Sequence, residues 1–364
     1  MENVRFVGLD VHADTIAIAV ADAGRDEPAP LATIPHDIPT LLKRLRRLGA
    51  VKCCYEAGPT GFGLHRALAA AGIECVVVAP SLVPTRSGDR VKTDRRDAVR
   101  LARFLRSGDL VEVHVPSAAT EAMRDLERAR DDAKRAELVA RHQLARFLLR
   151  HGRRFGGGKA WTHKHHQWLL TQRFDHPAQQ RVFDDYVKTV DDLKERVTHL
   201  TKSITELVES WELKPLVYAL QALRGVSTLS AVVLTAEVEN FARFERATKF
   251  MAYTGLVPSE RSSGEERRQG PITRTGNQHV RRILVESAWA YRYRPALSER
   301  LRARNRGLAD GVRRIAWRAQ LRLCGRFRQL LARGKNTNKA ITAIARELAG
   351  FVWAIAREEK LLVS

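Results

Sequence analysis

The chain is poor in cysteine and has no long apolar run. Its 364 residues include four cysteines, and no two of them form a CxxC pair. That scarcity predicts reduced core thiols rather than a disulfide framework or a structural zinc site. A signal peptide is not evident, and neither is an apolar stretch of roughly 18 residues, the length that a membrane span requires. The sequence therefore predicts a cytoplasmic protein with no membrane partner.

Negative charge is also scarce and is unevenly distributed. Lys and Arg number 63 against 41 Asp and Glu, giving a formal net charge of +22. Residues 1–115 carry +2, residues 116–214 carry +4, and residues 215–364 carry +16. Solubility does not require positive charge to be concentrated in one part of the chain, whereas a phosphate-binding surface concentrates it. We therefore expect a nucleic-acid partner that binds mainly to residues 215–364.

Residues 1–115 alternate between short β-rich runs and helical patterns. The runs predict strands at 4–9, 15–21, 51–56 and 74–80, with helices near 38–48 and 61–71. Such an alternation is typical of an α/β domain with a mixed sheet.

The rest of the chain is mostly helical in pattern. Residues 117–150 form one helical stretch, and an apolar heptad from Tyr186 to Trp211 predicts a coiled coil. The pattern leaves open whether these helices pair within one chain or between subunits. Residues 215–364 are helical and basic, with a predicted loop at 255–277. We thus predict three regions, which are 1–115, 116–214 and 215–364.

Four acidic residues stand out in the first region. Asp10 in FVGLDVH is predicted just past the end of the first strand, and Glu56 ends another. Asp94 and Asp97 in VKTDRRDA are three apart, so on a helix they share one face. Open α/β sheets place sites at the carboxyl ends of neighbouring strands. Burying a carboxylate without a partner is costly, so we expect the four to hold a hard cation such as Mg²⁺ or Mn²⁺. Two such ions can stabilise both the attacking and leaving oxygens of a phosphodiester.

A second group of candidates is the pair Ser262 and Ser263, followed by Gly264, in the predicted loop. A serine hydroxyl attacks phosphate when cations bind the phosphoryl oxygens and a base or metal takes its proton. Arginines surround the pair, and two more begin the next helix. The predicted nucleic-acid contacts are Arg261, Arg267, Arg268, Arg274, Arg281 and Arg282. Farther upstream, the histidines of WTHKHHQW fit no standard metal spacing, so we interpret them as solvated or in contact with nucleic acid.

Several motifs together resemble one family. GLDVH, YEAGPTG and KTDRRDA resemble the DEDD, RuvC-like domain of the insertion-sequence one-ten family of transposases. LRGVSTLSA, YTGLVPSERSSGE and ITRTGNQHVRRILVESAW are similar to the C-terminal transposase domain of that family. The resemblance covers nearly the whole chain, with the middle region least specific. It implies an α/β plus all-α protein: an RNase H-fold (RuvC-like) mixed sheet with helices, a coiled-coil middle and a helical C-terminal domain.

The resemblance also implies roles for single residues. Asp10, Glu56, Asp94 and Asp97 would be the metal-binding tetrad. The family serine stands directly before glycine, as Ser263 does, so Ser263 is the preferred nucleophile while Ser262 stays open. Where the family often has a second glycine and a lysine after that glycine, this chain has two glutamates at 265 and 266. Which cation lies nearest the phosphate is thereby left open.

The implied activity is DNA transposition through a covalent phosphoserine, guided by a structured non-coding RNA that pairs with donor and target DNA. The implied partners are donor and target DNA, this guide RNA, and further copies of the chain, as a dimer or tetramer through the coiled coil. The implied location is the bacterial cytoplasm, at the nucleoid. Because the acids and Ser263 are more than 150 residues apart, they would have to meet across domains, within one chain or between subunits.

Three other functions compete with this interpretation. A Holliday-junction resolvase-like nuclease would use the same acids with water, but would need neither Ser263 nor a basic C-terminal region. A sugar-kinase-like ATPase would explain GLDVH as a first phosphate loop, but the expected second Gly-rich loop is not evident. A non-catalytic nucleic-acid scaffold would not require four acids in this order.

Overall fold

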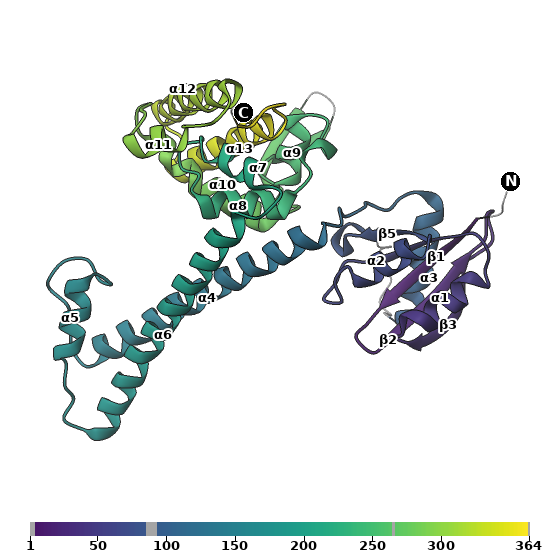
Figure 1. Cartoon of the computed structure of the whole chain (residues 1–364), viewed down its shortest axis with the longest axis horizontal. Helices are drawn as coiled ribbons and strands as arrows, with labels where there is room; N and C mark the ends of the chain where they lie inside the picture. The colour runs from purple at the N-terminus through teal and green to yellow at the C-terminus, as the bar shows by residue number, and fades with distance from the viewer. Residues whose placement is uncertain (1–3, 85–92, 264–265, 363–364) are drawn as a thin grey trace. The chain divides into compact units, whose positions relative to one another are not determined.

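The chain folds as two compact units, Met1–Val115 and Pro116–Ser364. The computed structural model describes residues 4–84, 93–263 and 266–362, and within these the side chains of 262–267 are not described. The first unit is a mixed five-stranded sheet with helices, of RNase H-like type, and the second is mostly helical (Figure 1). The predicted fold class is confirmed. The expected middle and C-terminal regions share the second unit, and the boundary between them stays a prediction. Among the described helices, none has the length and apolarity needed to cross a bilayer.

The sheet of the first unit has the strand order β3-β2-β1-β4-β5. Its strands are β1 (Arg5–Val11), β2 (Thr15–Ala21), β3 (Ala29–Pro35), β4 (Val51–Glu56) and β5 (Glu74–Val78). Its helices are α1 (Ile38–Arg46), α2 (Gly63–Ala70) and α3 (Asp94–Ser107), with a short 3₁₀ turn η1 (Pro80–Leu82). β1 is central, because it pairs antiparallel with β2 and parallel with β4.

The sequence patterns missed strand β3. Its sequence APLATIP contains Pro30 and Pro35, which remove backbone donors, and most of its side chains are exposed. β3 lies at the edge of the sheet and pairs with β2 alone. Edge strands tolerate proline and exposed polar surface, so the usual apolar alternation of a buried strand is absent there.

The two faces of the sheet carry different helices. Val7, Leu9 and Tyr55 belong to a core that includes buried leucines of α1 and α2. Gly8 faces α3 on the other side, where a β-carbon would clash with the backbone of Ala98 and Ala102. Glycine thus lets α3 lie directly on β1. Because side chains alternate along a strand, residues two positions beyond Gly8 and Cys54 also face α3.

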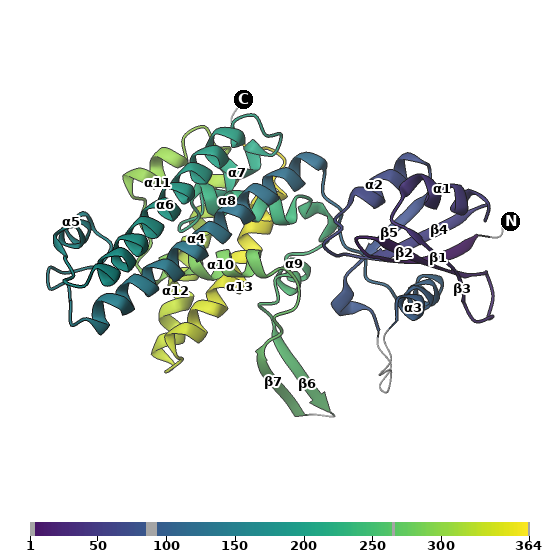
Figure 2. The same ribbon diagram turned by 90° about the horizontal axis from the view of Figure 1, so that it is seen from below.

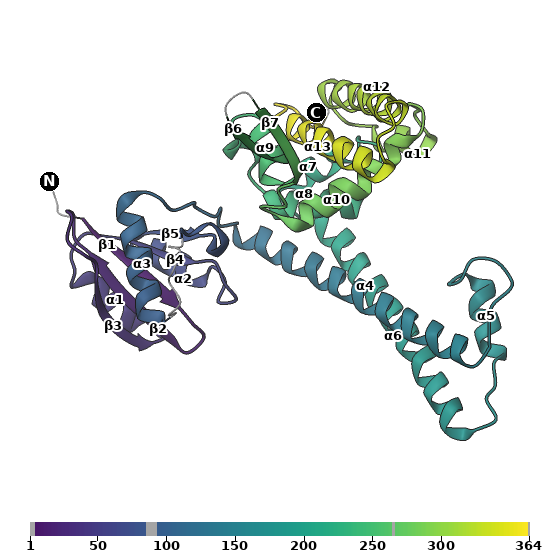
Figure 3. The ribbon, with the colours of Figure 1, turned by 180° about the vertical axis from the view of Figure 1, so that it is seen from behind.

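The second unit is built from helices around one large apolar core. The helices are α4 (Ala118–Arg150), α5 (His163–Thr171), α6 (Pro177–Val208), α7 (Lys214–Leu220), α8 (Thr228–Val238), α9 (Ala247–Tyr253), α10 (Gln278–Ala288), α11 (Glu299–Arg304), α12 (Asp310–Ala332) and α13 (Thr337–Ala356). Short 3₁₀ turns are η2 (Phe241–Arg243) and η3 (Trp289–Arg292). Every residue of α8 from Ala231 to Val238 is buried, and α10, α12 and α13 contribute to the same core (Figure 3).

Helices α4 and α6 form a long antiparallel hairpin within one chain, with α5 near its far end (Figure 1). The sequence left open whether these helices pair within one chain or between subunits, and in the structure α4 pairs with α6 of the same chain. Leu144, Phe183 and Val190 are buried in their contact. Two members of the heptad depart from it: Leu207 is 49% exposed, and Trp211 lies beyond the end of α6, buried in the core of the second unit.

The predicted loop at 255–277 is wrong in part, because it contains a β-hairpin. Strands β6 (Pro258–Ser263) and β7 (Glu266–Ile272) pair antiparallel and project from the helices (Figure 2). Their sequences are polar, and the side chains described from Ser259 to Gly270 are not buried. The apolar periodicity that identifies strands is therefore missing from this ribbon.

Candidate metal centre and nucleic-acid surface

Two of the predicted acids lie on neighbouring parallel strands. Leu9 of β1 is in register with Tyr55 of β4, and Asp10 and Glu56 are the next residues on each strand. Asp10 lies within β1, opposite Ala17 of β2, rather than just past the strand end as predicted. Pairing with β2 extends the strand beyond the apolar run that marked it. Asp10 and Glu56 therefore lie side by side on the face that α3 covers.

The other two acids lie in the first turn of α3. The helix begins after Thr93, whose hydroxyl accepts a hydrogen bond from the Arg96 backbone N–H at 3.4 Å. Asp94 and Asp97 follow, as acids favoured near a helix N-terminus. Asp97 is buried, with 8% exposure, while Asp94 is exposed. The close approach of α3 to β1 brings this turn to the carboxyl ends of β1 and β4.

Two basic side chains link the strand acids to the helix acids. His12 Nε2 lies 3.2 Å from Asp10 Oδ2 and 3.6 Å from Asp94 Oδ1. Arg100 Nη2 lies 3.1 Å from Asp97 Oδ1 and 3.5 Å from Glu56 Oε1. These contacts form two pairs, Asp10 with Asp94 and Glu56 with Asp97. The charge of Asp97 also acts on Asp10, so the two pairs adjoin and the four predicted acids form one cluster.

Sequence reasoning did not single out His12 and Arg100. His12 could have been found, since it follows Asp10 by two positions in GLDVH and so points to the same face of an extended chain. Arg100 follows Asp97 by three positions on a helix, which is a pairing distance. Its contact with Glu56 joins residues 44 positions apart, and a sequence pattern does not encode that.

The electrostatics of the cluster suit a cation. Burial raises the pKa of Asp10; the neighbouring His12 opposes this, and the charges of Asp97 and Asp94 add to it. One ligand atom each from Asp10, His12 and Asp94 lies within 4.8 Å of the other two. Carboxylate oxygens held this close repel one another unless positive charge is present, and hard divalent cations prefer such ligands. The residues present therefore fit a divalent metal ion.

The candidate serines lie at the end of strand β6. In the backbone register, Ser262 pairs with Arg267 and Ser263 with Glu266 of β7, so both serines lie in the last two positions of β6. The hydroxyl groups of both serines and the side chain of Arg267 lie outside the described part of the chain. Their backbone positions put the serines on a ribbon whose neighbouring described side chains, Arg261 and Arg268, are exposed.

The remaining predicted arginines divide into two groups. Arg261 and Arg268 face each other across the hairpin and are exposed, and Arg274 is exposed with a left-handed φ of 57°. Arg281 donates to the carbonyls of Thr254 at 2.9 Å and Thr275 at 3.0 Å, so it connects the two segments that flank the β6–β7 hairpin.

Arg282 contacts Asp131 of α4 at 2.9 Å and Glu286 at 3.4 Å. It therefore ties α10 to the long hairpin, and its charge is already engaged within the unit. The same holds for Arg281, so both of these predicted nucleic-acid contacts have structural roles as well.

A buried polar cluster joins the long hairpin to the helical core. Arg128 of α4 donates to both oxygens of Glu237 at 2.9 and 3.1 Å, and Asn277 Nδ2 also lies 2.6 Å from that carboxylate. Glu127 is 4% exposed, and its Oε2 has no hydrogen-bond partner among the described residues. Burial raises the pKa of Glu127 to about 7, and the charges of Asp131 and Glu237 add to that effect. The sequence analysis did not single out either buried acid, Glu127 on α4 or Glu237 on α8.

Comparisons with known proteins agree with this organisation. A family model described as "Transposase IS116/IS110/IS902 family" matches residues 217–302, and a DEDD transposase model of IS110 type matches residues 7–151. A putative transposase, y4qE, of Sinorhizobium fredii is 46% identical over 99% of this chain and 90% of its own length. The transposase for insertion sequence element IS1533 of Leptospira borgpetersenii is 32% identical over 93% of this chain and all of its own length. One model covers most of the first unit and α4, the other covers part of the helical core, and the similarity to the transposases runs along the whole chain. The chain therefore belongs to the IS110 family of transposases.

Proposed function

We propose that this transposase cuts and rejoins DNA strands with a metal-bound acidic tetrad and a serine nucleophile. The observation that carries the proposal is that four acids, Asp10, Glu56, Asp94 and Asp97, converge at the carboxyl ends of β1 and β4. These acids come from two strands and a helix, and Gly8 permits the close packing that brings them together. Membership of the family implies that the protein acts on DNA and uses a divalent metal. The roles of the individual residues are our proposal.

The tetrad would hold Mg²⁺ or Mn²⁺, with His12 and Arg100 at its border. A bound divalent ion supplies Lewis-acid stabilisation of the phosphoryl oxygens and of the attacking and leaving oxygens. The role of the chain is to fix the carboxylates. Asp10 and Glu56 are held by the register of β1 and β4, and Asp97 by burial against the sheet. Arg100 is placed to contact Asp97 and Glu56 and keeps them from separating.

Ser263 would attack a DNA phosphorus atom through its Oγ. A serine–phosphate ester forms as the bond from phosphorus to one deoxyribose oxygen breaks, and the serine proton passes to a base or to the leaving oxygen. A deoxyribose hydroxyl from another strand then attacks the ester, which forms the new DNA linkage and restores the serine. Support comes from the backbone position of the serines at the end of strand β6, next to the exposed pair Arg261 and Arg268. Ser262 is the alternative nucleophile.

Guidance by a structured non-coding RNA is also part of the proposal. An RNA that pairs with donor and target DNA removes the need for base-reading side chains in the protein. The charge distribution supports this, since residues 215–364 carry +16 and can bind phosphates regardless of sequence. Self-association through the long hairpin is supported by Leu138 and Val139 of α4, which are 53% and 56% exposed. Val139→Asp should lower the mass in sedimentation if this surface holds subunits together.

The decisive experiment traps the covalent intermediate. DNA substrate, guide RNA and Mg²⁺ are incubated with wild type, Ser263→Ala or Ser262→Ala, and protein–DNA adducts are measured under denaturing conditions. We expect Ser263→Ala to lose both adduct and recombination while nucleic-acid binding stays within about twofold. If Ser262→Ala has this effect instead, the nucleophile is Ser262.

If both serine variants recombine normally, the serine proposal fails and the resolvase-like use of water replaces it. Mixing Asp10→Asn protein with Ser263→Ala protein tests how the two sites cooperate. Recovery of activity in the mixture indicates that acids and serine act together from different subunits. Absence of recovery favours a site made from one chain.

A further inference from the structure

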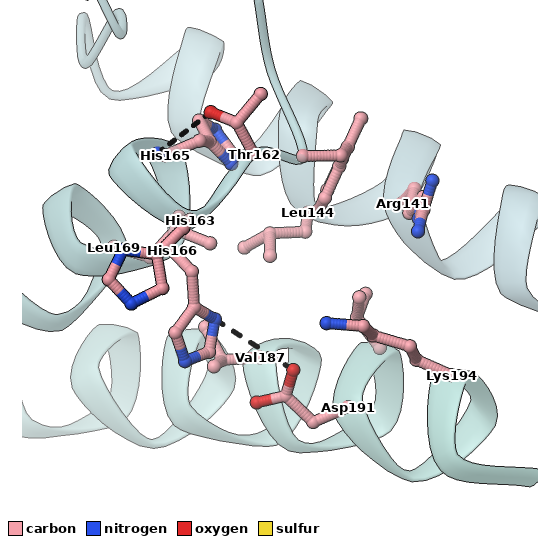
Figure 4. Close-up of a pocket in the computed structure, with 12 residues that line it drawn as sticks. Arg141, Leu144, Thr162, His163, His165, His166, Leu169, Val187, Asp191 and Lys194 are labelled. Atoms are coloured by element: carbon pink, nitrogen blue, oxygen red, sulfur yellow. Dashed lines mark hydrogen bonds and ion pairs between the residues drawn. The ribbon is translucent and has the colours of Figure 1, made fainter. Parts of the chain in front are cut away.

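A cavity of about 280 Å³ lies near the far end of the α4–α6 hairpin, and the proposed chemistry does not use it (Figure 4). Three helices and the segment before α5 form its wall. Arg141 comes from α4, His163 and His166 from α5, and Asp191 and Lys194 from α6. Its volume lies just below the usual range of small-ligand sites, which begins at about 300 Å³. It therefore suits a single ring system with a polar substituent rather than a folded segment.

The aromatic rings that line the cavity are those of Trp161 and three histidines, His163, His165 and His166. His165 is 5% exposed, and its ring centroid lies 5.0 Å from that of Trp161. Phe155 and Trp168 pack against His165 at 5.0 and 5.5 Å but do not line the cavity. Trp161 has a φ of 63°, which is unfavourable for a large side chain and is kept only where surrounding contacts enforce it. The Arg141 guanidinium lies 5.0 Å from the centroid of the Trp161 ring. Aromatic and guanidinium planes are the surfaces on which unstacked bases bind.

The end of the hairpin also concentrates positive charge. Residues 151–176 hold five Lys or Arg, one Asp and five His, so they carry +4. The remainder of 116–214 is neutral, which means that this segment accounts for the whole excess of that region. Among the described residues that line the cavity, Asp191 is the acid, and it lies 3.9 Å from His166 Nδ1. A carboxylate there can accept hydrogen bonds from the N–H groups of a base.

We infer that this cavity binds one unstacked nucleotide of a single-stranded nucleic acid. The base packs against Trp161 and the neighbouring histidines, and the phosphate lies near Lys194, since Arg141 is already paired with the buried Glu137. Single-stranded RNA and single-stranded DNA present this same chemistry. A duplex does not, because its bases are paired and stacked. The inference rests on the proposed function only in that the chain handles nucleic acid, and it requires neither the tetrad nor the serine.

The test measures binding to the full chain without catalysis. Fluorescein-labelled RNA and DNA strands of about 12 nucleotides, within the usual site size for single strands, are titrated against wild type and variants. Trp161→Ala should weaken binding about tenfold, as expected for loss of one base stack, and Lys194→Ala about threefold. Lys188→Ala is the matched control, since Lys188 lies on the same helix, pairs with Asp192 and does not line the cavity. It should change affinity less than twofold.

Photo-crosslinking locates the bound strand. We expect cross-links to peptides from 159–173, and an excess of duplex DNA should not remove them. If Trp161→Ala loses helix content in circular dichroism, Trp161→Phe takes its place and should retain most of the affinity. Equal weakening by Lys194→Ala and Lys188→Ala, or full competition by duplex, overturns the site.

The same assay distinguishes RNA from DNA as the source of the bound strand. Preferential cross-linking of RNA identifies an RNA nucleotide, and preference for DNA identifies an unpaired DNA strand. Performing the assay with Ser263→Ala protein keeps the two proposals apart, because binding in the cavity requires no catalysis. Cross-links at 159–173 in Ser263→Ala protein support the cavity whatever the adduct assay finds. A wild-type adduct that Ser263→Ala abolishes, without cross-links at 159–173, supports the serine and overturns the cavity.

Discussion

The two units of this transposase use charge in opposite ways. Residues 1–115 carry only +2, yet four acids gather at one edge of their sheet. Residues 215–364 carry +16, and many of their arginines lie on exposed surfaces such as the β6–β7 hairpin. Metal coordination needs ligands fixed within fractions of an ångström, whereas phosphate attraction acts over several ångströms in water. The difference explains why the acids are built on a buried sheet and the arginines are not.

The support beneath each set of residues differs accordingly. Leu9 and Tyr55, next to the strand acids, are fully buried, and α3 lies against the same strands. The hairpin that carries the serines has two strands and described side chains that are largely exposed. An isolated two-stranded hairpin is marginally stable. The chemistry of the first unit is therefore sensitive to packing, while that of the hairpin depends on what binds it.

The largest effect is expected from Asp10→Asn. The substitution removes one carboxylate charge from the tetrad but leaves the basic surface of the second unit unchanged. We expect recombination to fall by about three orders of magnitude or more, as for residues that act as a unit, while DNA and RNA binding change less than about twofold. Recombination and binding are measured side by side on the same protein preparation. Normal recombination by the variant would remove Asp10 from the metal site.

A double variant sharpens this result. Asp10→Asn combined with Asp97→Asn should lose little more activity than either change alone, because both residues serve one centre. Losses that multiply would mean that the two carboxylates act separately, and the cluster would then be an ion-pair network rather than one site.

Much of the first unit could be predicted from its sequence. The strands β1, β2, β4 and β5 and the helices α1 and α2 follow from the β-rich runs and helical patterns of the sequence. Helix α3 was not predicted; the three-residue spacing of Asp94 and Asp97 indicated only that they would share a face if they lay on a helix. Strand β3 was missed because an edge strand with prolines does not show that alternation. The contacts of His12 and Arg100 depend on tertiary distances, so the sequence could supply the four acids but not the side chains that join them.

The second unit was predictable in class but less so in detail. The heptad of α6 predicted a coiled coil, yet only the structure identifies α4 of the same chain as its partner. The ribbon carrying Ser263 was taken for a loop, because polar strands without a core lack periodicity. Buried Glu127 was not expected at all, since a carboxylate on the inner face of a helix contradicts the pattern used to find that face.

The next largest effect concerns salt. Neutralising about six phosphates predicts a log–log slope of affinity against salt of roughly −4 to −5. Arg261→Gln together with Arg274→Gln should reduce the steepness by about one to two, because each arginine on the second unit accounts for up to one phosphate. Arg44→Gln, an exposed arginine on α1 of the first unit, should leave the slope unchanged. Fluorescence anisotropy between 50 and 200 mM salt measures the slope for wild type, the double variant and Arg44→Gln. Equal slopes for all three proteins would contradict the conclusion that phosphates bind to the second unit rather than the first.

A substitution at Gly8 tests the packing beneath the tetrad. Gly8→Ala places a β-carbon against the backbone of α3, which cannot move aside as a flexible side chain can. We expect the first unit to lose about 3 kcal/mol of stability and the metal site to lose activity through displacement of Asp94 and Asp97. The second unit should be unaffected.

The chain contains separate probes for the two units. Cys53, Cys54 and Cys75 are buried in the first unit, and all six tryptophans lie at residue 161 or beyond. In Gly8→Ala the first-unit thiols should become reactive at lower urea concentration, while the tryptophan fluorescence transition stays where it is in wild type. A tryptophan transition that shifts with the thiols would show that the units unfold together.

The smallest effect is expected from Glu127→Gln, as a function of pH. Burial raises the pKa of Glu127 to about 7 from an ordinary value of 4.5, so the folded chain holds a proton that the unfolded chain releases. Stability therefore falls as pH rises from about 4.5 through 7, and the charged form costs the second unit on the order of 3 kcal/mol above that range. Glutamine removes the titration, so the variant should match wild type near pH 4.5 and be more stable at pH 8. Tryptophan-detected urea unfolding measures the difference, with Asp132→Asn, an exposed carboxylate of the same helix, as the control that should show little change with pH. A Glu127→Gln difference that is constant across pH would mean that this carboxylate is charged in the folded protein throughout and that Arg128 and Arg282 already offset its burial.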